Sequence, residues 1–553
     1  MPVIRLRYDE LETLTGVGIE RIKERLPLLC ADIERLEADY VDVEFPPNRP
    51  DLFSVEGVAR ALRQFLDIEP GLRSYKLERS GIEMVIEPSV LDVRPYIVCG
   101  VVRNVQFDSQ GIESLMLLQE HLHRGLGRNR RNVSVGVHDL GKVKPPFRYL
   151  AVEPSFSFVP LDYEEEMSMA EILERHPKGI DYRYILEGKA QYPLILDSDG
   201  NVLSFPPIIN GELTRVTEST RDLFIDVTGL NEHVSIALNI IAYALAERGG
   251  VIQSVTLRSP IEGGKKAKQT PDFEPARMDV SVEEVVSLLG IDLHAEDCKK
   301  CCERMGLGAE VKPGGLLEVQ IPAYRYDILH PWDIIEDIAI GYGYDRITPV
   351  IPGTMGIGEV HPMEERKIAV RAIMTGLGYL EVLTFTLTSE RKQFGLMKRS
   401  GREVEKVTVA SPISTEHTML RSSILPNLLE ILSINTHRDL PQRIFEVGQV
   451  LLKFEERYML AAVSTHAHAN FAEVKSVVEA VLKELGMADT TVVDSEDGAF
   501  LDGRRADIIH GNQPIGVFGE LHPEVILNFG LEHPVVGFEM DIGNSNAGKR
   551  GDK

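Results

Sequence analysis

Apolar residues along this chain follow two spacings in turn. Over 52–65 and 364–377 they recur every three or four positions, which predicts amphipathic helices. Over 97–105 and 442–452 apolar residues dominate or alternate, which predicts strands, and Asp199-Gly200 between two apolar runs predicts a hairpin turn. These segments are interleaved, so we expect an α+β multidomain fold. The same signals predict further helices over 114–124, 281–289 and 297–305, and further strands over 132–139, 317–326, 382–387 and 457–464.

Length and composition set the number of domains. The chain has 553 residues, of which 43% are hydrophobic, so several sizeable cores are expected. A polar stretch over 263–272 is predicted to be a linker. Changes in pattern predict four domains, over residues 1–85, 90–260, 274–350 and 355–545.

Charge and apolar run length exclude several classes of protein. The formal net charge of −25 makes the chain a poor general nucleic-acid binder, so RNA contact requires a local basic patch. Helices followed by a strand in 274–350 suggest a winged-helix-like module, but its acidic helix argues against DNA binding. No apolar run approaches the ~20 residues of a membrane span, and no signal peptide is evident. Five cysteines make no disulfide framework here, so we expect a cytoplasmic protein with no membrane partner.

An acidic helix is predicted to begin at Pro331. Asp333, Glu336 and Asp337 share one helical face, and Asp327 lies just before the helix. Carboxylates that converge on one point repel unless a cation or arginines lie among them, and oxygen ligands suit Mg²⁺. Favourable interaction of acidic residues with the helix macrodipole is the alternative.

This region also resembles a known family. The pattern Asp-x5-Asp-x2-Glu-Asp, followed by Ile-Gly-Tyr-Gly-Tyr-Asp-Arg-Ile, is similar to the B5 domain of phenylalanyl-tRNA synthetase beta subunits. Residues 48–60, Asn-Arg-Pro-Asp-Leu-Phe-Ser-Val-Glu-Gly-Val-Ala-Arg, resemble the signature of the first (B1) domain of that subunit. The resemblance implies that Mg²⁺ binds at Asp327, Asp333, Glu336 and Asp337.

One concentrated basic run stands out in the second predicted domain. We expect its arginines to contact tRNA phosphates, although a solvated loop is an equal alternative. The candidate residues are Arg124, Arg128, Arg130 and Arg131.

The segment 204–229 resembles the B3/B4 editing domain of archaeal and eukaryotic-type beta subunits, which hydrolyses tRNA mischarged with tyrosine. A pocket that recognises the extra hydroxyl of tyrosine needs polar groups in a tight cavity. The candidates by residue type are Ser204, Asn210, Thr214, Glu218 and Asp226, each of which could instead be a cap or turn residue. No nucleophile–base pair is evident, so we assign no catalytic base.

The last predicted domain resembles the catalytic-like module of the same subunit, built on the class II synthetase antiparallel sheet with helices. A working class II site carries an Arg-x-Glu pattern on a strand and a second arginine on a late Gly-rich helix. Here the strand reads Arg443-Ile-Phe-Glu446, and 529–537 contains no arginine. Without cations for the developing charge, we predict an inactive site that serves as a partner surface.

Taken together, the resemblance implies a beta subunit of phenylalanine–tRNA ligase of the archaeal or eukaryotic type. The expected partners are an alpha subunit in an (αβ)₂ heterotetramer and tRNA(Phe), with ATP and phenylalanine used by the complex. The alpha subunit would perform the ligation, and this chain would hydrolyse mischarged Tyr-tRNA(Phe). A non-catalytic scaffold or RNA-binding subunit without editing activity is the alternative.

Overall fold

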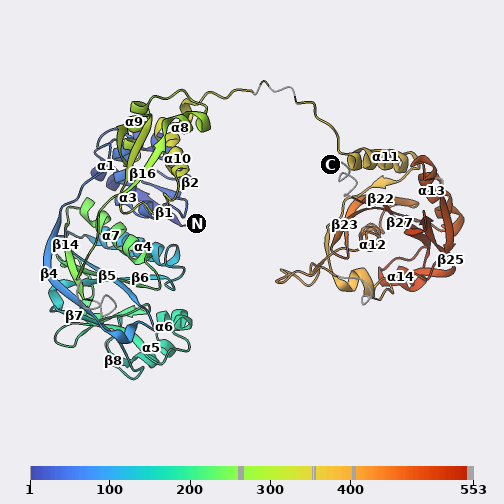
Figure 1. The fold of residues 1–553 in the computed structure, drawn as a ribbon. Coiled ribbons are helices and arrows are strands. Elements are labelled where there is room, and N and C mark those ends of the chain that lie inside the picture. The colour runs from blue at the N-terminus through green and yellow to red at the C-terminus, as the bar shows by residue number, and fades with distance from the viewer. Residues whose placement is uncertain are drawn as a thin grey trace. The chain divides into compact units, whose positions relative to one another are not determined.

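The computed structural model describes residues 2–258, 267–351, 353, 356–400, 406–487 and 489–544. They form two compact units, Met1–Ile351 and Pro352–Lys553 (Figure 1). Both units mix helices with several sheets, which confirms the prediction of a mixed, multidomain α/β chain. Among the described residues, no helix is both long and apolar enough to cross a bilayer.

The N-terminal module is a three-stranded antiparallel sheet, in the order β1-β3-β2, with three helices. Its third helix begins where the Ser54 hydroxyl accepts a hydrogen bond from the Gly57 amide at 3.2 Å. The elements are β1 (Val3–Arg7), α1 (Tyr8–Thr15), α2 (Ile19–Arg25), β2 (Asp32–Leu36), β3 (Tyr40–Glu44) and α3 (Val55–Phe65).

The central domain of the first unit is organised around a ten-stranded sheet. Its strands run in the order β12-β11-β10-β7-β4-β14-β5-β13-β6, with β15 paired to β14. A long apolar helix, α7, covers β5, β13 and β6 (Figure 1). The strands are β4 (Leu77–Ile86), β5 (Tyr96–Arg103), β6 (Val133–Asp139), β7 (Phe147–Val152), β10 (Tyr192–Leu196), β11 (Val202–Phe205), β12 (Ile209–Asn210), β13 (Leu223–Gly229), β14 (Val251–Arg258) and β15 (Lys268–Thr270). The helices are α4 (Ser109–Arg124), α5 (Met169–Arg175), α6 (Pro177–Tyr182) and α7 (His233–Glu247), and β8 (Ser157–Phe158) pairs with β9 (Met167–Ser168).

The acidic module follows, with a three-stranded antiparallel sheet in the order β16-β18-β17. Buried Ile334, Ile335 and Ile338 of its last helix pack into the module's core. The elements are β16 (Ala276–Ser281), α8 (Val282–Leu289), α9 (Ala295–Arg304), β17 (Gly308–Lys312), β18 (Leu316–Ile321) and α10 (Pro331–Tyr342).

The N-terminal and acidic modules repeat the same topology. Each runs strand, two helices, two strands and a helix, and each first helix ends at a left-handed glycine, Gly16 or Gly290. In each module, an Arg-x-Asp segment precedes the N-cap of the last helix by the same number of residues. The first unit therefore contains a structural duplication that its sequence hardly shows.

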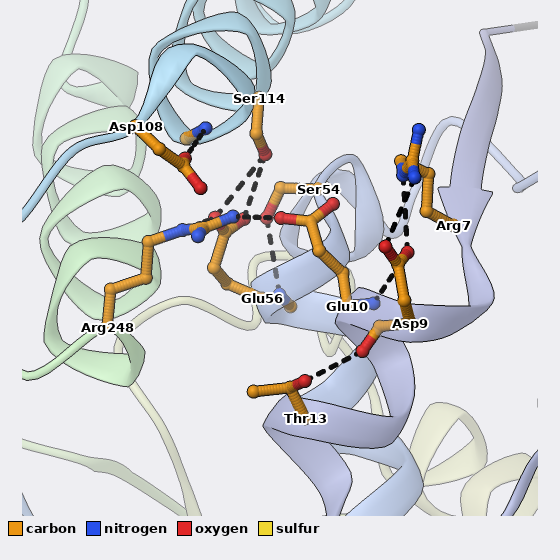
Figure 2. A network of polar contacts seen from close by, with 11 residues as sticks. Arg7, Asp9, Glu10, Thr13, Ser54, Glu56, Asp108, Ser114 and Arg248 are labelled. Atoms are coloured by element: carbon orange, nitrogen blue, oxygen red, sulfur yellow. Dashed lines mark hydrogen bonds and ion pairs between the residues drawn. The ribbon is translucent and has the colours of Figure 1, made fainter. Parts of the chain in front are cut away.

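Polar contacts join the N-terminal module to the central domain (Figure 2). Arg248, just after α7, donates to Glu56 on α3, and its Nη2 donates to Glu10 on α1 at 2.8 Å. Ser114 on α4 donates to the same Glu56 carboxylate at 3.2 Å. Glu56 is buried, so these donors satisfy a carboxylate that water does not reach.

The second unit has three layers. A seven-stranded sheet, in the order β19-β22-β23-β27-β26-β25-β24, is antiparallel except for the β19–β22 pair. Helices α11 and α13 share one core with the sheet, and α12 and α14 share another. The elements are α11 (Pro362–Gly376), β19 (Leu380–Glu381), β20 (Leu387–Thr388), β21 (Met419–Leu420), α12 (Leu425–Ile434), β22 (Gln442–Leu452), β23 (Glu455–Thr465), α13 (Phe471–Glu484), β24 (Thr490–Asp494), β25 (Phe500–His510), β26 (Gln513–Leu521), α14 (Pro523–Asn528) and β27 (Val535–Asn544).

Three local predictions differ from the structure. The strand predicted over 317–326 ends early, because β18 stops at Ile321. The predicted strand over 382–387 is wrong, because only its last residue is in a strand, β20. Its backbone instead makes single contacts, such as Val382 N to Phe445 O at 2.8 Å and Arg421 N to Thr386 O at 2.8 Å. The predicted linker over 263–272 lies partly outside the described residues, and its residues 268–270 form β15.

Candidate functional site

A cavity of about 440 Å³ opens in the central domain. Its walls come from α4, β6, the segment from β11 to Val216, β13 and α6. This volume lies within the range of small-ligand pockets, ~300–1,000 Å³. The cavity is therefore the candidate site of the first unit.

A hydrogen-bonded chain of three side chains lies at the cavity wall. His138 Nε2 is 2.7 Å from Asp226 Oδ2, and His138 Nδ1 is 2.8 Å from the Thr214 hydroxyl. Thr214 and Asp226 line the cavity, whereas His138 lies behind them with no solvent exposure. A carboxylate only accepts, so Nε2 carries a proton toward Asp226. The Thr214 hydroxyl lies within hydrogen-bond distance of both His138 Nδ1 and the Gly211 carbonyl, the latter at 3.2 Å. The arrangement orients a hydroxyl and a carboxylate toward whatever enters the cavity.

Gly136 makes this chain possible. In the β6–β13 register Gly136 lies opposite Asp226, and His138 lies two residues further along β6. A Cβ on Gly136 would come within 2.1 Å of Asp226 Oδ2 and 2.8 Å of His138 Nε2. Only glycine therefore leaves room for the Asp226 side chain to reach the histidine diagonally across the two strands.

Four of the five polar residues predicted for an editing pocket line the cavity. They are Ser204, Asn210, Thr214 and Asp226, while Glu218 is exposed outside it. His138 was not among the predicted residues, although its strand was predicted. The signal available in the sequence was a histidine within a strand of small and apolar residues, which does not by itself indicate its partners.

The basic run divides into one half-buried and three exposed arginines. Arg130 lines the cavity with a side chain that is 11% exposed, whereas Arg124, Arg128 and Arg131 are exposed. Arg124 is 3.3 Å from Glu120. For Arg128 and Arg131 no carboxylate among the described residues lies within ion-pair distance, so both remain available to external anions.

Burial shifts the protonation of the α4 side chains at this wall. Burial lowers the pKa of His123 to about 4, and its Nε2 accepts from the Val135 amide at 2.8 Å. The close approach of His123, whose Nδ1 lies 3.5 Å from Glu120 Oε2, and then the charge of Arg130 hold the pKa of Glu120 well below its usual range. Near pH 7 the wall therefore presents a neutral His123 and an ionised Glu120.

Comparison with known proteins places the whole chain. Residues 278–344 match the tRNA synthetase B5 domain, and residues 347–542 match the phenylalanyl tRNA synthetase beta chain CLM domain. The phenylalanine–tRNA ligase beta subunit of Methanothrix thermoacetophila is 54% identical over 98% of this chain and 100% of that protein. This chain belongs to the phenylalanine–tRNA ligase beta subunit family. The subunit from Archaeoglobus fulgidus is 52% identical over 98% of each chain.

A solved structure in the beta subunit family matches a large part of this chain. It is an N-terminal fragment of the Pyrococcus horikoshii phenylalanyl-tRNA synthetase beta subunit, 37% identical, with a TM-score of 0.59. The similarity covers 62% of this chain and 99% of the fragment. Membership in the family makes the chain a member of an aminoacyl-tRNA ligase complex.

The four predicted Mg²⁺ ligands of this family member do not meet at one point. Arg325 donates to both oxygens of Asp327, at 2.8 and 2.7 Å, and to Asp337 at 2.8 Å. Asp333 instead accepts from the amides of Leu329 and His330, both at 2.8 Å, and Glu336 is exposed. Among the described residues, the one group of carboxylates close enough to share a metal is Asp32, Glu34 and Glu44.

Arginines therefore neutralise Asp327 and Asp337 in this conformation. Arg49 binds Asp51 with the same two-pronged geometry, at 2.8 Å for each contact, and Arg60 lies 3.9 Å from Asp51. Burial raises the pKa of Asp337, although nearby Arg325 and then Arg49 oppose the shift. Nη1 of Arg60 and Nη1 of Arg325 lack acceptors among the described residues. Buried N–H groups without a partner need a hydrogen-bond acceptor beside them, and a further cation would be repelled by these arginines. The arrangement therefore does not fit a Mg²⁺ ion held by all four predicted carboxylates.

The second unit uses its charged residues in pairs and caps. Glu446 accepts from Arg421 at 2.7 Å, and Arg443 lies 3.6 Å from Glu473. His522, a turn histidine before proline, accepts from the Glu524 amide at 3.1 Å and so caps α14. These groups serve the fold, and the described residues of 529–537 carry no arginine.

Proposed function

We propose that this chain is the editing beta subunit of phenylalanine–tRNA ligase and hydrolyses Tyr-tRNA(Phe) in the cavity of the central domain. It would pair with an alpha subunit in an (αβ)₂ heterotetramer. That complex would use ATP to attach phenylalanine to tRNA(Phe), with the ligation on the alpha subunit. The family membership and the polar cavity support this assignment of editing to the beta subunit and ligation to the alpha subunit.

One observation supports editing most directly, namely the carboxylate of Asp226 in the cavity wall. His138 occupies Oδ2, and Oδ1 has no hydrogen bond among the described residues. A buried acceptor of this kind is satisfied by the phenol O–H of tyrosine and left unpaired by phenylalanine. Sites built to bind a substrate hydroxyl discriminate strongly against the analogue that lacks it.

The remaining groups have supporting roles in this proposal. His138 orients Asp226 and contacts the Thr214 hydroxyl, and Ser204 and Asn210 add polar groups to the wall. The exposed Arg128 and Arg131, with Arg124, form a basic surface for tRNA phosphates. The sheet of the second unit, a class II-like fold without the Arg-x-Glu pattern on β22, would contact the alpha subunit.

Mg²⁺ stays a prediction within this proposal, and no catalytic step is assigned to it. Asp333 and Glu336 are the predicted ligands that Arg325 does not engage. Asp327 and Asp337 could bind the ion only if Arg325 released them.

Deacylation of Tyr-tRNA(Phe), with Phe-tRNA(Phe) as the competing substrate, tests the editing proposal on the purified chain and on its complex with the alpha subunit. We expect Asp226→Asn to slow Tyr-tRNA(Phe) deacylation by roughly a hundredfold, because a charge-assisted hydrogen bond is lost. Asp199→Asn, in an exposed hairpin, is the matched control. If neither preparation hydrolyses Tyr-tRNA(Phe), the non-catalytic scaffold is the better description.

A further inference from the structure

Two cations of the cavity wall lie against the same aromatic ring. The Arg130 guanidinium carbon is 4.4 Å from the centroid of Tyr182, and Lys178 Nζ is 6.0 Å from that centroid. Both side chains line the cavity that contains Asp226. Arg130 comes from the loop after α4 and Lys178 from α6, so two separate segments bring positive charge to one place.

The loop that carries Arg130 is strained and firmly held. Arg128, Asn129 and Arg130 have φ values of 47°, 54° and 64°, which side chains other than glycine seldom adopt. Arg94, which is 1% exposed, holds this loop by donating to the carbonyls of Arg131 at 3.0 Å and Arg130 at 3.2 Å. Strained backbone that its surroundings enforce is typical of ligand sites.

The Arg130 guanidinium is fixed but keeps donors unused. Nη1 donates to Ile208 O at 2.9 Å and Nη2 to Glu120 at 3.2 Å, while Nε has no partner among the described residues. Glu120 offsets the charge of Arg130. Net positive charge beside the Tyr182 ring therefore requires a second cation there.

Lys178 is that second cation. It is half-buried, and no carboxylate among the described residues lies within ion-pair distance of its ammonium group. Its backbone amide donates to His176 Nδ1 at 3.1 Å, which fixes the start of α6 beside the cavity. A half-buried lysine without a carboxylate partner is suited to an anionic ligand.

We propose that Lys178 and Arg130 form a subsite for the 5′-phosphate of the nucleotide that carries the aminoacyl ester. This inference rests on the proposed editing function and names how its substrate is anchored. The ester lies on the terminal ribose, so that phosphate must lie near the cavity whenever the amino acid occupies it. Asp162 in the same wall is paired with Arg215 at 2.5 Å, but Glu120 and Asp226 would repel a phosphate without such cations.

Calorimetry on the full-length chain, with adenosine 5′-monophosphate and adenosine as probes, tests the subsite without relying on activity. We expect the monophosphate to bind about tenfold more tightly than adenosine at low salt. Lys178→Ala should remove most of this difference, and Lys178→Arg should keep it. Lys189→Ala, whose ammonium group donates to Asp92 O, is the control and should bind both probes as the unsubstituted chain does.

Equal binding of the two probes by the unsubstituted chain, or an undiminished difference in Lys178→Ala, would overturn the subsite. Deacylation kinetics keep this result separate from the proposed function. With an active editing site, Lys178→Ala should raise KM for Tyr-tRNA(Phe) and leave kcat nearly unchanged. An inactive unsubstituted chain with an intact preference for the monophosphate would reject editing and retain the subsite.

Discussion

Replacing Arg325 by methionine should destabilise the acidic module severely. The Arg325 side chain is 2% exposed and makes three charge-assisted hydrogen bonds, two to Asp327 and one to Asp337. Those carboxylates are 8% and 5% exposed, so Arg325→Met leaves two buried anions without their cation. Breaking a buried ion pair from one side costs about 3–5 kcal/mol, and we expect a loss near the middle of that range.

The single tryptophan of the chain gives a local assay. Trp332 lies in the first turn of α10 and its indole N–H donates to Glu284 at 2.6 Å, so its fluorescence reports the acidic module. Urea denaturation followed at Trp332 should show a lower midpoint for Arg325→Met. Adding Asp337→Asn should recover part of the loss, because a neutral amide is less costly to bury than a carboxylate.

The pH dependence supplies a second check with a definite sign. Burial already raises the pKa of Asp337 in the folded chain above its unfolded value. The folded state thus binds a proton at Asp337 more readily than the unfolded state does. The cost of burying the Asp337 carboxylate therefore disappears as pH falls through the folded pKa. Removal of Arg325 raises that pKa further, so the deficit of Arg325→Met should shrink on acidification. A free energy of unfolding within about 0.5 kcal/mol of the unsubstituted chain at neutral pH, the size expected of a surface substitution, would refute the reasoning.

Two other outcomes follow from the structure. Burial lowers the pKa of His123 to about 4, below the ~6.5 of an unfolded histidine, so stability should fall by about 2 kcal/mol from pH 7 to pH 5 as the unfolded state gains the proton first. His123→Gln should lose that slope in urea denaturation, and a slope equal to that of the unsubstituted chain would contradict this. If Asp333 and Glu336 bind Mg²⁺, alanine at both positions should weaken binding in calorimetry, whereas unchanged binding would end the assignment. Weaker binding in Glu34→Gln would place the ion at the Asp32–Glu34–Glu44 group.

Residue type and spacing anticipated much of the fold because local patterns determine local elements. The strand predicted over 442–452 coincides with β22, and the helix predicted to begin at Pro331 does so. The alternation over 382–387 misled the prediction, since Leu383 and Phe385 are each 80% exposed and no neighbouring strand among the described residues pairs with them. A strand needs a partner, and a local pattern does not supply one.

The candidate site was only partly accessible from the sequence. The polar residues of segment 204–229, which resembles an editing domain, indicated Ser204 and Asp226. The contact of Asp226 with His138 depends on the register between β6 and β13, which are far apart in the chain. Likewise, the acidic spacing around α10 was correctly recognised as helical. It could not show that Arg325 takes the place between Asp327 and Asp337 where a cation was expected.

The duplicated modules limit how this chain can be recombined with its relatives. The two copies interact electrostatically although they are distant in the chain. The charges of Arg325 and Asp327 in one copy shift the pKa of Arg49 in the other, and the charge of Arg325 lowers the pKa of Asp51. A chimera that exchanges only the N-terminal copy would pair guanidinium and carboxylate groups from two different lineages in a largely buried site. Grafting both copies together should preserve expression. The N-terminal and acidic modules therefore have to be exchanged as a pair, which the sequence of either module alone does not indicate.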